Sequence, residues 1–170
     1  MNSIDVLTDA FGRIPDILKR ALDGADHAAL TARLDPEANT LAWLAWHTGR
    51  EQDAQIADLA GTDEVWVSDG WAERAGLDLP DTDMGYGHTA EQVAKVDVSA
   101  EVLLGYTDAV TLAVHRYLER LVDSDLDVVV DERWDPAVTL GVRLVSVVGD
   151  ALEHAGQAAF LRGLLDRRIP

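Results

Sequence analysis

Apolar residues recur every three or four positions in four long stretches of the chain, which is the spacing of an amphipathic helix. The stretches cover residues 4–22, 36–59, 99–121 and 139–165. Four such helices predict an all-α four-helix bundle, in which each helix turns one apolar stripe toward a shared core. A length of 170 residues suits one domain, and no internal repeat divides the chain, so we expect a single domain over 1–170.

Local signals refine the ends of these helices. Asp35 followed by Pro36 predicts the start of the second helix, because Asp caps helix N-termini and Pro suits the first turn. Gly61 predicts its end, and Ser99 is a suitable cap for the third helix. Between the third and fourth helices, Pro136 closes a segment that we expect to be briefly extended.

The connection between the second and third helices is long and weakly periodic, from 62 to 98. It predicts one short helix near Trp71 and another that opens at Thr89, with Gln92 in the capping-box position. Long connections inside compact domains are often functional. We therefore expect this connection to be an elaboration of the bundle near its functional site.

Charge excludes several classes of partner. The chain has 31 acidic and 14 basic residues, a net charge of −17, and no basic patch interleaved with aromatics. Such a surface is repelled by nucleic-acid phosphates and by anionic lipid. The first residues lack the pattern of a signal peptide, and no apolar run approaches the ~20 residues that span a membrane. We expect a cytoplasmic protein that binds neither nucleic acid nor membrane.

The chain contains no cysteine. This excludes a disulfide framework, a thiolate zinc site and a nucleophilic thiol of the protein's own. A metal ion must therefore be held by His, Asp, Glu or water, and thiol chemistry requires a thiol from outside. Sequence motifs of serine hydrolases, P-loop proteins, dinucleotide-binding proteins and zincins are absent.

Three residues form a candidate metal site. His47 lies in the most apolar part of the second helix, while Asp150 and His154 lie one turn apart on the same face of the fourth. Two histidines and a carboxylate suit zinc, iron or nickel, and spacing does not choose among these metals. The same pattern also fits an ordinary Asp150–His154 ion pair with His47 hydrogen-bonded in the core, or Asp150 paired with Arg143.

Other side chains are candidates for supporting roles. Gln157 lies one turn beyond the last candidate ligand, where it would orient that ligand or hydrogen-bond elsewhere. Arg50 would bind an anionic substrate or lie at a surface or interface. Glu51 would pair with Arg50 or replace the aspartate as a ligand. Tyr86 and His88, in a glycine-rich loop, would close over a substrate or belong to an ordinary loop before a capped helix.

Two segments resemble the signature helices of a known family. "TLAWLAWHTGREQDAQIADLAG" and "VRLVSVVGDALEHAGQAAFLRGLL" are similar to those of the DinB-like superfamily, with its DinB/YfiT-like four-helix bundle, near the branch of mycothiol-dependent maleylpyruvate isomerases. Members commonly bind a divalent metal through a His in the second helix and an H-x3-H pair in the fourth. His47 and His154 match the outer two positions. Asp150 stands where many relatives have His, and the isomerase branch is similar in placing a carboxylate there.

The resemblance implies one divalent metal ion, zinc first and nickel or iron as alternatives, held by His47, Asp150 and His154. It also implies a low-molecular-weight thiol of the mycothiol type as cosubstrate. The activity would be a thiol-dependent transferase or isomerase acting on a small electrophile. Those isomerases carry a further C-terminal domain, whereas this sequence stops at Pro170, so the resemblance implies the scaffold and metal more than the isomerase reaction.

Two alternatives remain beside the enzyme. The chain would also fit a non-catalytic metal- or ligand-binding protein of the stress response, as many DinB-like proteins have no established activity. Exposed tryptophans and leucines on a short bundle further predict a homodimer.

Overall fold

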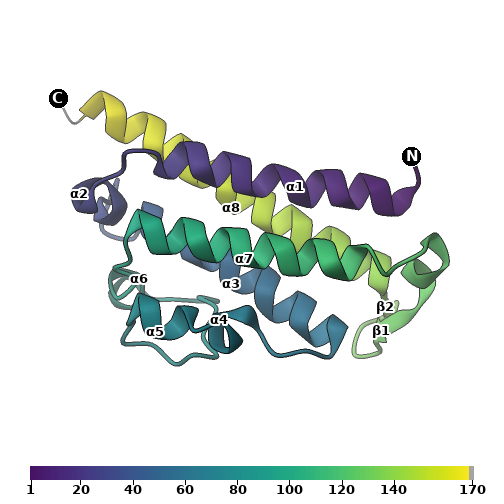
Figure 1. Cartoon of the computed structure of the whole chain (residues 1–170). Coiled ribbons are helices and arrows are strands. Elements are labelled where there is room, and N and C mark those ends of the chain that lie inside the picture. Colours follow the sequence, from purple (N-terminus) through teal and green to yellow (C-terminus); the bar gives the residue numbers. More distant parts are fainter. Residues whose placement is uncertain (169–170) are drawn as a thin grey trace.

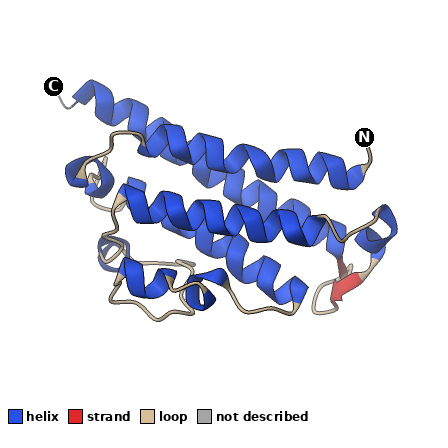
Figure 2. Cartoon of the chain, in the orientation of Figure 1, coloured by secondary structure: helices blue, strands red, loops and turns tan. Residues whose placement is uncertain are grey.

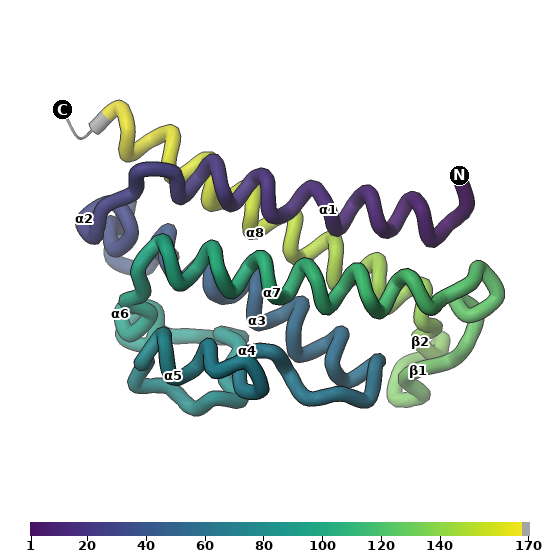
Figure 3. Tube along the Cα trace, in the orientation of Figure 1, coloured from purple at the N-terminus to yellow at the C-terminus, as the bar shows by residue number. Residues whose placement is uncertain are grey.

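The computed structural model describes residues 1–168 and contains a bundle of four long helices (Figures 1 and 3). These are α1 (Ser3–Leu22), α3 (Leu41–Ala60), α7 (Ala100–Leu118) and α8 (Leu140–Arg168). Helices α1 and α3 each pack against both α7 and α8, so the order around the bundle is α1, α7, α3, α8. The predicted all-α DinB-like four-helix bundle is confirmed.

The start of the second long helix differs from the prediction. Helix α3 begins at Leu41, where the Thr40 hydroxyl accepts the Trp43 N–H at 3.0 Å. The carboxylate of Asp35 instead accepts the N–H of Glu37 at 2.9 Å, two residues on, which is the local turn that Asp forms as readily as a helix cap. The helix predicted from residue 36 was therefore five residues too long.

A short helix, α2 (His27–Thr31), precedes this turn and was not predicted, because five residues are too few to establish a period. The cap of α7 was predicted correctly, since the Ser99 hydroxyl accepts the Val102 N–H at 3.3 Å.

The connection between α3 and α7 folds into three short helices, α4 (Val65–Ser68), α5 (Trp71–Ala75) and α6 (Ala90–Ala94). Helix α5 and the capping box of α6 confirm two predictions, whereas α4 was missed. Helices α4 and α5 lie against α7, and α4 also touches α3 (Figure 1).

The chain between α7 and α8 forms a 3₁₀ helix, η1 (Asp123–Asp127), and a small hairpin of β1 (Val129–Asp131) and β2 (Val138–Thr139) (Figure 2). The strands are antiparallel, with Val129 opposite Thr139 and Asp131 opposite Val138. The predicted extended segment is confirmed.

Helix α3 is the most enclosed element, because α7, α8 and the connection after it cover three of its sides. Every residue from 41 to 53 is buried, including six polar ones: His47, Thr48, Arg50, Glu51, Gln52 and Asp53. Close approach to α7 depends on Gly49, since a Cβ there would lie 2.6 Å from the Tyr106 ring. Buried polar groups are costly unless they are paired or bind a ligand, so α3 is where a functional site is expected.

Among the described residues 1–168, no helix combines the length and the apolarity that a bilayer crossing requires.

Candidate metal centre

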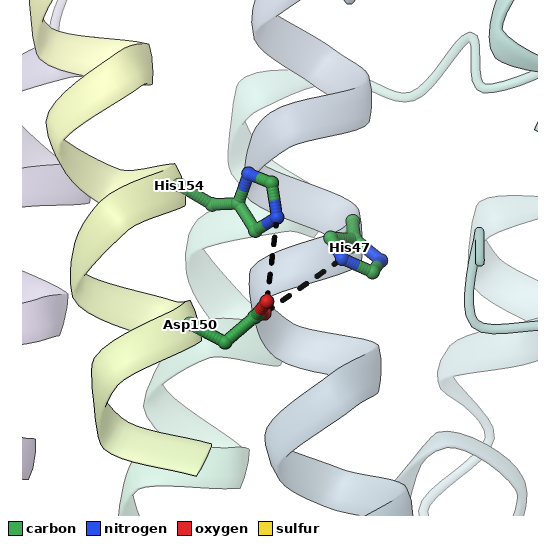
Figure 4. Close-up of side chains that lie close together, drawn as sticks. All are labelled: His47, Asp150 and His154. Carbon is green, nitrogen blue, oxygen red and sulfur yellow. Dashed lines mark ion pairs between the residues drawn. The ribbon is translucent and has the colours of Figure 1, made fainter. Parts of the chain in front are cut away.

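The three candidate ligands lie together between α3 and α8 (Figure 4). Each of His47, Asp150 and His154 offers one ligand atom, and these atoms lie within 4.8 Å of one another. Asp150 Oδ2 is 3.9 Å from His47 Nε2, and Asp150 Oδ1 is 3.7 Å from His154 Nε2. Such gaps exceed hydrogen-bond lengths, and they are near the ~3–4 Å that separates ligand atoms around a metal with bonds of about 2.0–2.1 Å.

Both histidines are held with the same ring nitrogen toward the carboxylate. Nδ1 of His47 donates to the backbone carbonyl of Met84, and Nδ1 of His154 donates to Gln157 Oε1 at 2.9 Å. A carbonyl oxygen only accepts, so each Nδ1 carries the proton and each Nε2 keeps a lone pair that faces Asp150. This is the arrangement by which proteins orient metal-ligating histidines. Gln157 thus contacts a candidate ligand, and its role in orienting a metal-bound histidine stays a prediction.

Electrostatics favour a cation at this point. Burial lowers the pKa of His47, so its imidazole is neutral and able to act as a ligand. Asp150 Oδ2 is buried without a hydrogen-bond partner among the described residues, although the whole Asp150 side chain is 41% exposed. Two imidazoles around an unpartnered carboxylate oxygen fit a divalent ion such as zinc, iron or nickel.

Glu51 adds a second carboxyl group beside this cluster. One of its oxygens accepts from the Gln55 amide, and the other is buried without a partner in the described chain. Burial, and then the charge of Asp150, raise the pKa of Glu51 to about 8. Its charged neighbours, Asp150 and Arg143, lie on α8. Glu51 does not pair with Arg50, so that expectation was wrong, and Asp150, not Glu51, lies with the two histidines as the candidate carboxylate ligand.

Arg50 is unavailable to a substrate. Its side chain is 0% exposed, and it donates to the backbone carbonyls of Asp81 and Asp83 while pairing with Glu64. The expectation that Arg50 binds an anion or lies at a surface was therefore wrong. The alternative pairing of Asp150 with Arg143 is also absent, because Arg143 pairs with Asp131 at 3.1 Å.

The glycine-rich loop divides into an exposed and a buried residue. Tyr86 is 92% exposed, and no hydrogen bond or aromatic contact joins it to the cluster within residues 1–168. The side chain of His88 is 3% exposed, accepting from Trp43 Nε1 at 3.1 Å and donating to Asp83 at 2.9 Å. The structure thus brings neither residue to the open side of the site, and the predicted lid role finds no support in their contacts.

Two contributors to the site were missed by the sequence analysis. The Met84 carbonyl is a backbone atom, so no residue type marks it in the sequence. Trp43 stacks on His47, with ring centroids 4.6 Å apart and planes 16° from parallel. Its position one turn before His47 in the sequence is a signal for this contact, because residues four apart lie on the same face of a helix.

A shallow hollow of about 170 Å³ adjoins the cluster through Gln157. It is lined by residues of α3, α8 and the turn before α3: Leu34, Asn39, Leu44, Gln157, Phe160 and Leu161. A larger hollow of about 280 Å³ lies between α3 and α7, and its walls include none of the three candidate ligands. The walls of the smaller hollow also include none of the three candidate ligands, but they include Gln157, which hydrogen-bonds to His154.

A family model described as mycothiol-S-transferase matches residues 6–167, which include all three candidate ligands. Among solved structures, the crystal structure of a conserved protein from Enterococcus faecalis is similar, with a TM-score of 0.89 and 35% sequence identity. That match covers 95% of this chain and 96% of the other. No curated protein matches the chain.

Proposed function

Since this chain belongs to the mycothiol-S-transferase family, we propose that it is a metal-dependent transferase that joins a mycothiol-type thiol to a small electrophile. The resemblance to the DinB-like superfamily is confirmed by the same match. One observation carries the proposal beyond the family: two imidazole lone pairs and an unpartnered carboxylate oxygen converge at a partly exposed point.

The protein's own residues would hold the ion and keep one side open. His47 and His154 would bind through Nε2, and Asp150 through a carboxylate oxygen. Three protein ligands leave a coordination position for a further molecule. A bound divalent ion lowers the pKa of a coordinated thiol and holds it as the thiolate near neutral pH. Because the chain has no cysteine, that thiol must come from outside.

The proposed thiol transfer needs no oxidant, reductant or further cosubstrate. The thiol loses its proton to water, its sulfur forms a bond to an electrophilic carbon, and the displaced group leaves with the electron pair of the broken bond. The hollow beside Gln157 offers an apolar wall from Leu44 and Phe160 and a polar edge from Asn39. We therefore propose an electrophile with an apolar or aromatic body.

Zinc, a cytoplasmic location and a homodimer complete the proposal. Zinc suits a set of two imidazoles and one carboxylate, with nickel and iron as alternatives. A reduced thiol cosubstrate fits a reducing compartment. Exposed apolar side chains on α8, with Val145 61% and Phe160 66% exposed, favour self-association, which the mass of the particle in solution tests directly.

A thiol-transfer assay tests the function. Zinc-loaded, nickel-loaded and metal-free protein would be incubated with mycothiol and a panel of aryl halides and epoxides, and the thioether product measured by mass spectrometry. We expect product only with the metal-loaded wild type, and its loss in Asp150→Asn, which removes the charge at constant size. Metal binding without product for any electrophile would contradict the transferase and leave the non-catalytic metal- or ligand-binding protein. Equal product after chelation would contradict the role of the metal.

A further inference from the structure

Arg50 makes an unusual set of contacts for an arginine. It lies on α3 one turn beyond His47, and its side chain has no exposed surface. Nε donates to the Asp83 carbonyl at 3.0 Å, and Nη2 donates to the Asp81 carbonyl at 2.9 Å. One planar guanidinium thus holds two carbonyls of a single loop, a geometry that the rigid fork of arginine favours.

The rest of the guanidinium is anchored to the bundle. Nη1 lies 2.6 Å from Glu64 Oε2 and 3.6 Å from Asp53 Oδ2, and it donates to the Tyr106 hydroxyl at 3.3 Å. Arg50 is therefore fixed from behind by groups on α3, α7 and the residue before α4. These contacts fix the orientation of the Arg50 guanidinium toward the loop, because a buried charge that lost a partner would be left unpaired at a high cost.

The same loop is held a second time on its other side. Asp83 accepts from the Gly85 N–H at 2.8 Å and from His88 Nε2 at 2.9 Å. His88 in turn accepts from the Trp43 indole N–H at 3.1 Å, which ties it to α3. Met84 lies between Asp83 and Gly85, and its carbonyl accepts a hydrogen bond from His47 Nδ1.

We propose that Arg50 is a positioning residue for the metal centre. By holding the Asp81 and Asp83 carbonyls, it keeps the Met84 carbonyl against His47 and so sets the tautomer that leaves Nε2 free. This inference rests on the proposed metal-dependent function, and it assigns to Arg50 a task on the side of His47 that faces away from Asp150. Loss of the hydrogen-bond partner of a metal-ligating histidine weakens metal binding by about 10–100-fold.

Two glycines of the loop provide a matched pair for the test. Gly85 and Gly87 both have positive φ, +95° and +70°, so an alanine strains the backbone at either position. A Cβ at Gly85 would lie 3.0 Å from His47 Nδ1 and from the Trp43 and Trp46 rings, whereas at Gly87 it would meet nothing within 4 Å. Only Gly85→Ala should therefore push the loop away from His47.

The experiment combines a tautomer measurement with zinc affinity. Wild type, Arg50→Lys, Gly85→Ala and Gly87→Ala would be labelled with ¹⁵N-histidine, and the His47 resonances identified by their absence in His47→Gln. Lysine keeps the charge of Arg50, but its single ammonium lacks the fork that spans both carbonyls. We expect the Nδ1-protonated form in metal-free wild type and Gly87→Ala. In Arg50→Lys and Gly85→Ala we expect its loss, with a zinc Kd about 10–100-fold weaker.

Folded Arg50→Lys that keeps the wild-type tautomer and zinc Kd would overturn the proposal. Should Arg50→Lys fail to fold, the glycine pair decides, and equal behaviour of Gly85→Ala and Gly87→Ala overturns it. If the wild type binds neither zinc, nickel nor iron, the proposed function fails, while the tautomers in metal-free protein still test whether Arg50 and the loop control His47.

Discussion

Helix α3 contributes to two polar clusters that differ in how their charges are satisfied. The Arg50 cluster lies toward α7 and the connection, and comprises Arg50, Asp53, Glu64 and Tyr106. The metal cluster lies toward α8, and comprises His47, Asp150 and His154.

In the Arg50 cluster every charge lies against an opposite charge or a hydrogen-bond donor of the protein, although Glu64 Oε2, 2.6 Å from Arg50 Nη1, makes an ion pair there and no aligned hydrogen bond. Arg50 pairs with Glu64, and Asp53 accepts from the Val65 and Trp66 N–H groups and from the Tyr106 hydroxyl. Burial raises the pKa of Tyr106 well above its ordinary value, so this phenol stays protonated as a donor.

In the metal cluster, by contrast, one oxygen of Asp150 is buried without a partner, as is one oxygen of the neighbouring Glu51. An unsatisfied buried polar group costs about 1–3 kcal/mol, more when charged. A bound cation would complete both groups. We therefore propose that the Arg50 cluster stabilises the fold, whereas the metal cluster binds an ion.

The largest effect should come from breaking the Arg50 cluster. Arg50→Met leaves the buried Asp53 and the partly buried Glu64 carboxylates without their cation and should lower the free energy of unfolding by about 3–5 kcal/mol. Urea denaturation of metal-free protein measures this. A loss below ~1 kcal/mol would mean that the cluster is not structural.

Asp150→Asn should weaken zinc binding without destabilising the metal-free protein. It removes the ligand charge at constant size, so zinc affinity should fall by more than the ~10–100-fold that a lost hydrogen-bond partner costs. The metal-free protein should lose no stability, since Asp150 Oδ2 has no hydrogen-bond partner to lose and its charge no longer faces Glu51. Zinc titration and urea denaturation of the same samples check both parts, and a large stability loss would contradict the contrast with Arg50.

The stability of the protein should depend on pH through Glu51, which lies beside the metal cluster. Its pKa is raised from 4.5 to about 8 in the folded protein. The unfolded state therefore loses its proton first, and stability falls as pH rises between these values, by up to ~1.4 kcal/mol per pH unit. Glu51→Gln stays uncharged and should remove this slope. Urea denaturation of metal-free protein at pH 5, 6.5 and 8 compares the two, and parallel curves would refute the shift.

Bound zinc should change this pH dependence of stability. A divalent cation beside Glu51 favours its carboxylate, so the slope of the wild type should flatten when zinc is bound. An unchanged slope in saturating zinc would place the ion away from this cluster.

The smallest effect is expected outside both clusters. Tyr86 is 92% exposed, so Tyr86→Ala should change stability by less than ~0.5 kcal/mol and leave zinc affinity unchanged. A drop in transferase turnover at constant zinc affinity would revive the idea that this loop covers a substrate.

The two clusters also differ in how far the sequence predicts them. The metal cluster follows from helical spacing, which puts Asp150 and His154 on one face, and from the family resemblance, which adds His47. The sequence does not predict the contacts of Arg50, because its guanidinium binds backbone carbonyls 31 and 33 residues away. Carbonyls have no residue identity, so a loop that folds back on a helix leaves no pattern in the sequence.

The same reasoning explains the errors in the fold. The four long helices came from a period that repeats over many residues, which a few exceptions do not hide. The start at Pro36 rested on one local signal, and Asp35 satisfies that signal equally well with a turn. Long-range periodicity was thus reliable here where short motifs were ambiguous.

The most direct test of the central claim is the metal content of the purified protein, measured by elemental analysis beside His154→Ala. We predict about one zinc, nickel or iron ion per chain in the wild type and its loss in the variant, because three ligands become two. No metal in the wild type after reconstitution, or the same amount in His154→Ala, would contradict a metal centre at His47, Asp150 and His154.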